Sequence, residues 1–259
     1  MSANSTAGRM NEQSRLLSDA RRRRACSLSG LLSLGVLLGL LLLSSACTAT
    51  TVLQAGFNSD SVNSPPSPNQ TVGTVSVSPG TVVVAAPTPT LPSNKWVRLT
   101  KTDKFGNPSS IRGNFSGPHG LGNYTLEASL FIPSKTGDVP TGAVSLEFDS
   151  LNLGPNPLGF MHIDFMPEGD VRIDDDEKQR FGHYPRDQPF AVTVNLVITD
   201  AKAVAHIQLF GTGASGTFDA TVNPDFLGVA RNFGAVTFFM GTPWQGAFFV
   251  DDIIVTRKG

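Results

Sequence analysis

Tyr124-Thr-Leu-Glu-Ala-Ser-Leu-Phe-Ile132 carries an apolar side chain at every second position, with mostly polar side chains between them. Alternate side chains of an extended chain point to opposite faces, so this spacing predicts a β-strand with one dry face and one wet face. The stretches 144–149 and 161–165 repeat the alternation. The chain is therefore expected to consist mainly of strands that each bury one face.

Short turns join the later strands into hairpins. The turns are Pro167-Glu-Gly-Asp170 and Thr199-Asp-Ala-Lys202, each placed between two alternating stretches. The strands on either side of these turns, and those expected after them, span 161–165, 171–174, 190–198, 203–210, 217–222, 235–240 and 248–255. No stretch predicts a helix of more than two turns. The pattern therefore predicts an all-β fold, a sandwich of two antiparallel sheets around a Phe-rich core.

Three longer stretches share an order of strands and turns with one class of sandwiches. They are Gly159-Phe-Met-His-Ile-Asp-Phe165, Gly182-His-Tyr-Pro-Arg-Asp-Gln-Pro-Phe-Ala-Val-Thr-Val194 and Gly246-Ala-Phe-Phe-Val-Asp-Asp-Ile-Ile-Val255. In this order they resemble the concanavalin A-like jelly roll of laminin-G-type modules and of many bacterial glycan-associated domains. The resemblance implies a two-sheet jelly roll and a binding module whose ligand is a glycan.

The N-terminal region has the pattern of an export signal. Arginines occupy 21–24, an almost wholly apolar run covers 28–43, and Leu43-Ser-Ser-Ala-Cys47 follows. The last stretch resembles the lipobox of bacterial lipoproteins, although Ser44 stands where an aliphatic residue is usual. That resemblance implies a signal peptide over 1–46 and a lipid on Cys47. An ordinary cleaved signal and an uncleaved anchor remain alternatives, since about 20 apolar residues suffice to span a bilayer.

Residues 47–94 are rich in Ser, Thr and Pro and contain one charged residue, Asp60. Pro65-Pro-Ser-Pro68 and Ala86-Pro-Thr-Pro-Thr90 interrupt any regular element. Such a composition predicts a disordered tether, because it buries too little apolar surface to offset the entropy of ordering. The recurring Val residues of 72–84 leave an edge strand as an alternative. The β-sandwich domain is then expected over 95–259.

Cysteine content and charge exclude several functions. Cys26 and Cys47 are the only cysteines, so the expected domain has neither a disulfide nor a cysteine nucleophile. From Thr48 onward there are 14 Lys and Arg against 19 Asp and Glu, a net of −5, with no basic cluster. Nucleic acid is therefore not an expected partner.

Several charged residues fall on the polar faces of the predicted strands. They are Glu147, Asp149, His162, Asp164 and Arg172. If their strands share a sheet, these side chains would form a hydrogen-bonding platform for a hydroxyl-rich ligand, or an acid and base pair for a lyase. His162 and Asp164, two apart on one strand, are the best candidate couple. A plain solvated surface is the alternative.

One hydrolytic mechanism is disfavoured by the spacing of the acidic residues. Glycosidases of the resembled fold that cut β-glucans carry two glutamates flanking an aspartate on one strand, which places two carboxyls about 5 Å apart. Glu147 and Asp149 match the first two positions, and Leu151 occupies the third. The carboxylate pair is incomplete, so a noncatalytic module is expected.

Aromatic and acidic residues near loops are further candidates. Tyr184 and Trp244 could stack on a sugar ring. Trp244 lies in the predicted loop Gly241-Thr-Pro-Trp-Gln-Gly246, where capping of the core is the favoured role and ligand binding the alternative. Asp251 and Asp252 interrupt an apolar strand. The resemblance implies a structural calcium ion on one of them, and a hydrogen bond to loop backbone is the alternative.

Together these patterns predict a lipid-anchored, extracytoplasmic protein of a bacterial cell envelope. Thr48, rather than aspartate, after Cys47 favours the outer membrane where a cell has two, a rule carried over from the lipoprotein resemblance. The expected function is noncatalytic binding of a polysaccharide or other glycan. A glycan-active hydrolase or lyase of the same fold, and a structural or protein-binding surface module, remain alternatives.

Overall fold

The structure is a computed structural model and describes residues 48–87, 94–117, 119–151, 159–174, 176 and 180–258. The expected signal segment 1–46 and Cys47 lie outside these residues. No helix in the described ranges is long and apolar enough to cross a membrane.

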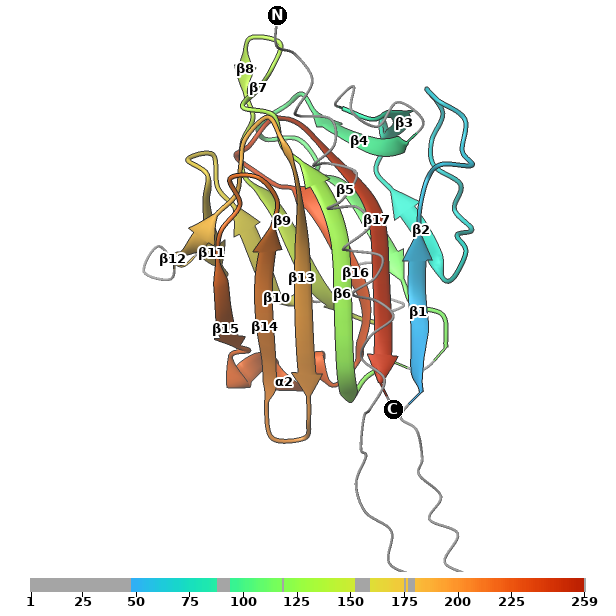
Figure 1. Cartoon of the computed structure of the whole chain (residues 1–259), viewed down its shortest axis with the longest axis vertical. Coiled ribbons are helices and arrows are strands. Elements are labelled where there is room, and N and C mark those ends of the chain that lie inside the picture. The colour runs from blue at the N-terminus through green and yellow to red at the C-terminus, as the bar shows by residue number, and fades with distance from the viewer. Residues whose placement is uncertain are drawn as a thin grey trace, which may run out of the picture. The chain divides into compact units, whose positions relative to one another are not determined.

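One sheet has eight strands and runs β15-β14-β13-β6-β17-β4-β3, with β1 paired to β17 beside β4 (Figure 1). Its long central strands are β6 and β17, and every pairing is antiparallel. The strands are β1 Ala49–Ala55, β3 Val82–Ala85, β4 Lys95–Lys101, β6 Gly122–Phe131, β13 Pro189–Ile198, β14 Ala203–Phe210, β15 Thr217–Thr221 and β17 Gly246–Lys258.

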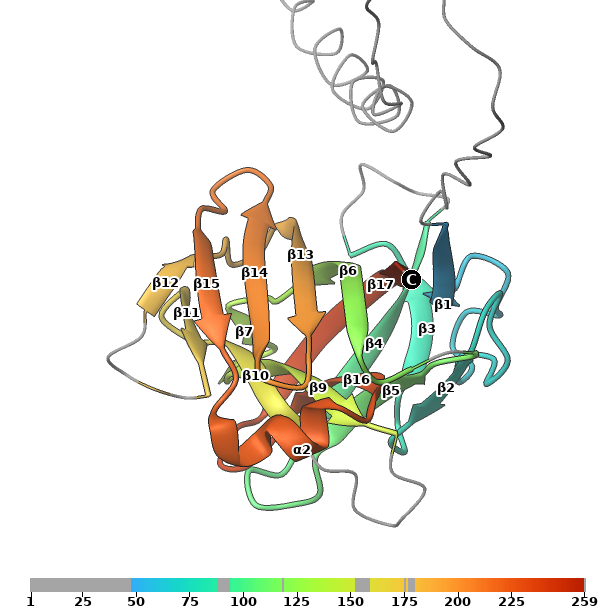
Figure 2. The same cartoon turned by 90° about the horizontal axis from the view of Figure 1, so that it is seen from below.

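The second sheet has seven strands in the order β12-β11-β10-β9-β16-β5-β2 and is also antiparallel. The strands are β2 Thr74–Val77, β5 Ser109–Asn114, β9 Val144–Ser150, β10 Gly159–Phe165, β11 Asp170–Ile173, β12 Arg180–His183 and β16 Phe233–Met240. A short hairpin pairs β7 Lys135–Thr136 with β8 Val139–Pro140, and η1 Pro224–Phe226 leads into α2 Leu227–Ala230. Figure 2 shows the sheets as two layers, with α2 beside β9 and β10 at one end. The predicted all-β jelly-roll sandwich is confirmed.

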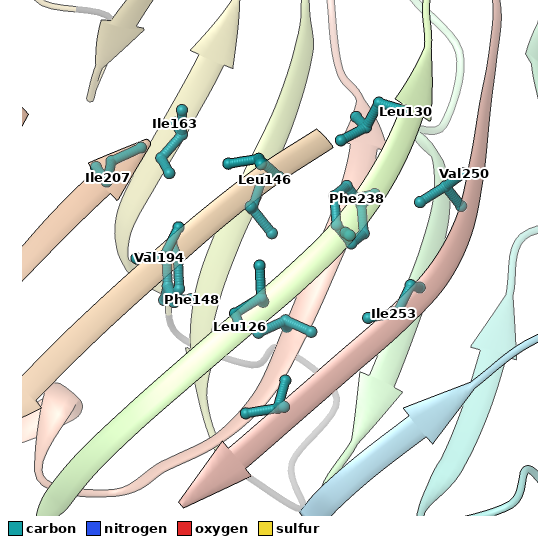
Figure 3. Close-up of a cluster of buried hydrophobic side chains, with 14 of the residues drawn as sticks. Leu126, Leu130, Leu146, Phe148, Ile163, Val194, Ile207, Phe238, Val250 and Ile253 are labelled. Carbon is teal, nitrogen blue, oxygen red and sulfur yellow. The ribbon is translucent and has the colours of Figure 1, made fainter. Parts of the chain in front are cut away.

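The core lies between the inner faces of the two sheets (Figure 3). Leu126 and Val250 come from the eight-stranded sheet and face Phe148 and Phe238 of the seven-stranded sheet, and each is at most 1% exposed. These are the alternate positions that the sequence marks as apolar. Full burial of one such side chain contributes about 1.5–3 kcal/mol, so the inner faces supply the main stabilisation.

The expected disordered tether over 47–94 is wrong for the residues of it that the structure describes. The segment adds three strands to the two sheets: β1 pairs with β17, β2 with β5 and β3 with β4. Val52, Leu53 and Phe57 are fully buried. A Val-rich segment with few charges cannot fold alone, but it can bury its apolar residues on edges that the rest of the sandwich supplies. The domain therefore begins near residue 48, and the alternative of an edge strand within 72–84 was nearer the structure.

Candidate functional site

The charged residues singled out from the sequence lie together on the outer face of the seven-stranded sheet. Val144, Leu146 and Phe148 of β9 enter the core, so Ser145, Glu147 and Asp149 point away from it. The outward side chains of this part of the sheet form what we call the polar face: Arg112, Ser145, Glu147, Asp149, His162, Asp164, Arg172, Thr237 and Phe239.

Strand register arranges the polar face in rows. One row runs Arg112, Thr237, Glu147, His162 across β5, β16, β9 and β10. The neighbouring row runs Ser110, Phe239, Ser145, Asp164, Arg172 and reaches β11. Directly opposed side chains in a sheet lie about 4.5–5.5 Å apart at their Cβ atoms, so each row is a continuous line of neighbours.

His162 and Asp164 form the couple that their spacing predicts. The imidazole Nδ1 lies 2.9 Å from Asp164 Oδ2 and 3.1 Å from Oδ1, and Ser145 Oγ donates to Oδ1 at 2.6 Å. On the other side of the ring, Nε2 lies 3.7 Å from Asp174 Oδ1. Burial opposes a charge on the ring, but the carboxylates of Asp164, Asp174 and Glu147 outweigh it and raise the pKa of His162.

Asp149 is held in a second network. Its Oδ2 accepts from Arg112 Nη1 and, at 2.5 Å, from Thr237 Oγ1, while Arg112 Nη2 donates to the Ser150 carbonyl at 3.0 Å. Asp149 is 1% exposed, and its Oδ1 has no hydrogen-bond partner in the part of the chain that the structure describes. Burial raises the pKa of this carboxyl, although the hydrogen bond from Thr237 and the charge of Arg112 lower it. Arg112 and Asp149 therefore form a fixed ion pair within the polar face.

Glu147 lies between these two networks and belongs to neither. No hydrogen bond or ion pair holds its carboxyl group within the described part of the chain. Burial and the nearby Asp149 raise the pKa of Glu147 to about 7, against the lowering effect of His162 and Arg112. The side chain extends over Gly159, where any Cβ would collide with it. At neutral pH this carboxyl group can therefore either donate or accept a proton.

The structure adds three residues that were not singled out. Arg112 lies on β5, whose sequence Ser109–Asn114 is rich in Ser, Gly and Asn and so does not show the apolar alternation of a strand. Thr237 and Phe239 lie on β16. The ring of Phe239 is half-buried and lies outside the core, because Phe238 and Met240 point inward. Alternation within the predicted strand 235–240 is the signal that could have placed Thr237 and Phe239 outward.

The predicted aromatic candidates do not join the polar face. Tyr184 is 3% exposed, and its hydroxyl donates to the Met166 carbonyl at 2.6 Å, so its ring has no free face for a ligand. Trp244 lies in the loop between β16 and β17, half-buried against the core and against Gly142. This packing favours the capping role for Trp244.

Asp251 and Asp252 do not form a calcium site by themselves. Asp251 is fully buried; Asn94 Nδ2 donates to its Oδ2 at 2.9 Å, and its Oδ1 has no hydrogen-bond partner among the described residues. Asp252 is exposed and has a φ of 51° at the bulge of β17. Calcium takes six to eight oxygen ligands, and the described ranges contain no group of three or more His, Cys, Asp or Glu that could hold a metal ion.

No protein-family model and no curated protein matches the chain. Solved structures with a similar backbone include arcelin-5, a lectin-like defense protein from Phaseolus vulgaris (TM-score 0.48, 11% identity, 82% of this chain and 99% of that chain). The galactose complex of lectin UEA-II scores 0.47 at 11% identity, over 82% and 99% of the two chains. The exoplasmic/lumenal domain of VIP36 bound to Ca²⁺ and Man3GlcNAc scores 0.43 at 10% identity, over 71% and 84%. These similarities concern the backbone, and the site rests on the side chains described above.

Proposed function

We propose that the protein is a noncatalytic carbohydrate-binding module whose ligand lies on the polar face. The observation that carries the proposal is the set of outward hydrogen-bonding side chains beside a half-exposed aromatic ring, Phe239. Asp164 and Arg112 are oriented by their own partners, while no hydrogen bond or ion pair among the described residues holds the carboxyl group of Glu147. Hydroxyl-rich ligands need such preorganised polar groups, and the Phe239 ring offers an apolar surface for the C–H face of a pyranose.

Binding to neutral glycans tests the proposal. Glycans ending in galactose, fucose or mannose are suitable first probes, in an array and then by calorimetry. We expect Phe239→Ala and Glu147→Gln each to weaken binding about tenfold, equivalent to about 1.4 kcal/mol. Thr193→Ala, which removes an outward hydroxyl from β13 of the other sheet, is the matched control and should bind as the wild type. Failure of every glycan to bind, or full binding by both polar-face variants, would refute the proposal.

An enzyme of the same fold is the second candidate, and Glu147 is the observation that favours it. A carboxyl group with a pKa of about 7 is suited to act as a general acid, and His162 stands opposite it across β9 and β10. Release of new reducing ends or unsaturated sugars from a polysaccharide by the wild type, and its loss in Glu147→Gln, would support this candidate. Tight binding without product over a long incubation supports the binding module.

Anchoring through lipid on Cys47 completes the proposal and rests on the resemblance of 43–47 to a lipobox. Buried acyl chains contribute roughly 0.8 kcal/mol per methylene, so several chains hold a protein at the membrane permanently. We expect labelled fatty acid to enter the wild-type protein and not Cys47→Ser, and we expect the variant to leave the envelope fraction. Recovery of unlabelled wild type in the cytosol would contradict the proposed location, which is the outer membrane in a two-membrane cell.

Calcium is left out of the proposed function because Asp251 offers only one free carboxylate oxygen. A calcium-dependent rise in melting temperature that is lost in Asp251→Asn would restore a structural ion at that position.

A further inference from the structure

A polar depression lies where a loop joins β4 to β5. Its volume is about 270 Å³, slightly below the usual range for small-molecule pockets of about 300–1,000 Å³. The lining consists of Ser78, Pro79, Thr100, Lys101, Thr102, Asp103, Gly106, Asn107, Pro108 and Ser109. None of these residues belongs to the polar face, so the depression is a separate feature.

Lys101 is a buried cation in this lining. It is the last residue of β4, where it follows Val97 and Leu99 in pointing inward, and it is 4% exposed. Its ammonium group donates to the Asp103 carbonyl, and no carboxylate lies within ion-pairing distance in the ranges that the structure describes. An ammonium group has three donors, and burial of an unpaired charge is costly. The position is therefore suited to an anionic group that enters the depression.

Hydroxyl groups surround the same space. Ser109 is the first residue of β5, is 4% exposed and points inward. Its Oγ accepts from Ser78 Oγ at 3.5 Å, and Ser78 Oγ lies 3.3 Å from Thr81 Oγ1. The Ser110 backbone N–H donates to Ser78 Oγ at 2.9 Å, which fixes that hydroxyl. The one acidic side chain in the lining is Asp103, whose carboxylate accepts from the Phe105 N–H at 2.9 Å within its own loop.

Phe105 lies on this loop between two lining residues. It is 80% exposed, which makes it the most exposed large apolar side chain that the structure describes. Its ring is not part of the lining, but an exposed aromatic ring on the loop that borders the depression offers a flat surface to a ring-shaped ligand.

We infer that the depression binds the carboxylate of a sugar acid, with Lys101 opposite the charge, Ser109 and Ser78 as hydrogen-bonding groups, and Phe105 against the sugar ring. The choice of a sugar acid rests on the proposed carbohydrate function, whereas the site for a carboxylate rests on Lys101 alone. The charge-assisted part of such binding weakens as salt is added.

The test compares trigalacturonate with its methyl ester, which keeps the sugar and removes the charge. With the full-length protein in detergent, calorimetry should show the acid binding about tenfold more tightly than the ester, a preference worth about 1.4 kcal/mol. Lys101→Met should abolish this preference and leave binding of neutral glycans to the polar face unchanged. Lys104→Met removes an exposed lysine from the same loop and should keep the preference.

A purely structural Lys101, which only ties the loop through the Asp103 carbonyl, makes the opposite prediction. Lys101→Met would then lower the melting temperature and leave the ratio of acid to ester binding as in the wild type, and that result overturns the inference. The inferred site predicts a melting temperature that is unchanged or higher, because an unpaired buried charge is removed. If Lys101→Met does not fold, Phe105→Ala decides: we expect it to weaken trigalacturonate about fivefold, and unchanged affinity overturns the inference.

The outcomes also separate this inference from the proposed function. Neutral glycans that bind through Phe239, together with no preference for the acid, overturn the sugar-acid site alone. An acid preference that depends on Lys101, without any binding of neutral glycans, overturns the polar-face proposal alone. Equal binding of inorganic phosphate, sulfate and trigalacturonate overturns the assignment to a sugar acid.

Discussion

At the scale of single residues, Asp251 is a buried acid whose ionisation changes the stability of the fold. It is fully buried, and burial together with the neighbouring Asp252 raises the pKa of its carboxyl to about 7, despite hydrogen bonds from Asn94 and backbone that lower it. The native state therefore holds a proton that the unfolded chain, with the ordinary value of 3.8, releases at lower pH. The stabilisation is complete below about pH 4 and is lost as the pH rises through about 7.

Replacing Asp251 by Asn should remove this loss. The quantity to compare is the free energy of unfolding of Asp251→Asn minus that of the wild type. We expect this difference to be larger at pH 8 than at pH 5 by on the order of 2 kcal/mol. Urea unfolding at the two pH values measures it. Asp252→Asn is the comparison variant: Asn tolerates its positive φ, and the variant keeps the buried Asp251 carboxyl but removes a charge that raises its pKa, so its advantage should grow less than that of Asp251→Asn. An advantage of Asp251→Asn that is equal at both pH values would contradict the argument.

Glu147 and His162 influence each other across the polar face. The Glu147 carboxylate is one of the groups that raise the pKa of His162, together with Asp164 and Asp174. Glu147→Gln should therefore move the titration of the His162 imidazole to lower pH, which NMR detects directly. The imidazole signals of His206, which pairs with Asp219 on the other sheet, should stay where they are. A His162 titration unchanged by Glu147→Gln would mean that the two side chains are not coupled in solution.

At the scale of elements, β1 and β5 depend on each other. Leu53 of β1 is fully buried and lies over Gly113 of β5, where a Cβ would come within 2.5 Å of Leu53 Cδ2. Gly113 has no positive φ, so the fit is a matter of space and not of backbone strain. The leucine of one sheet therefore fills the room that the glycine of the other sheet leaves.

A double-mutant cycle tests this contact. Leu53→Ala should cost about 2–5 kcal/mol by opening a cavity. Gly113→Ala should cost about 1–3 kcal/mol by overpacking. In the double variant the alanine at 113 occupies part of the cavity, so the combined cost should fall short of the sum by on the order of 1 kcal/mol or more. Additive costs, measured by urea unfolding, would show that the two strands do not pack in this way.

The same contact explains which elements the sequence could predict. Strands such as β6 and β9 carry their own alternation of apolar and polar residues, so their inner faces can be predicted from the sequence of each strand alone. The inner face of β5 is Ser109, Ile111 and Gly113, and the apolar cover over the glycine comes from Leu53 of β1. A prediction that treats 47–94 as a tether therefore also fails to identify β5 as a strand and Arg112 as a residue of the site.

The polar face was predictable as a set of outward side chains, but the pairing of Arg112 with Asp149 depends on a register between strands distant in the chain.

At the scale of the whole molecule, residues 48–87 belong to the same sandwich as the strands after residue 94. The strands of this segment cover the C-terminal half of β17 and the edges of β4 and β5, as Figure 1 shows for β1 beside β17. Val52, Leu53, Phe57 and Val83 are fully buried within it. At about 1.5–3 kcal/mol for each side chain, their burial is comparable with the 5–15 kcal/mol of net stability usual for a domain.

A fragment of residues 95–259 should therefore not fold cooperatively, whereas 48–259 should unfold in a single transition. Far-UV and near-UV circular dichroism with urea measures both, and adding a peptide of residues 48–87 to the shorter fragment is the informative control. If the missing strands are needed only for their contacts, the peptide should restore part of the native signal, and Leu53→Ala in the peptide should weaken that rescue. A sharp unfolding transition of the shorter fragment would contradict this prediction. It would show that residues 95–259 fold without β1, β2 and β3, as the tether hypothesis for 47–94 requires.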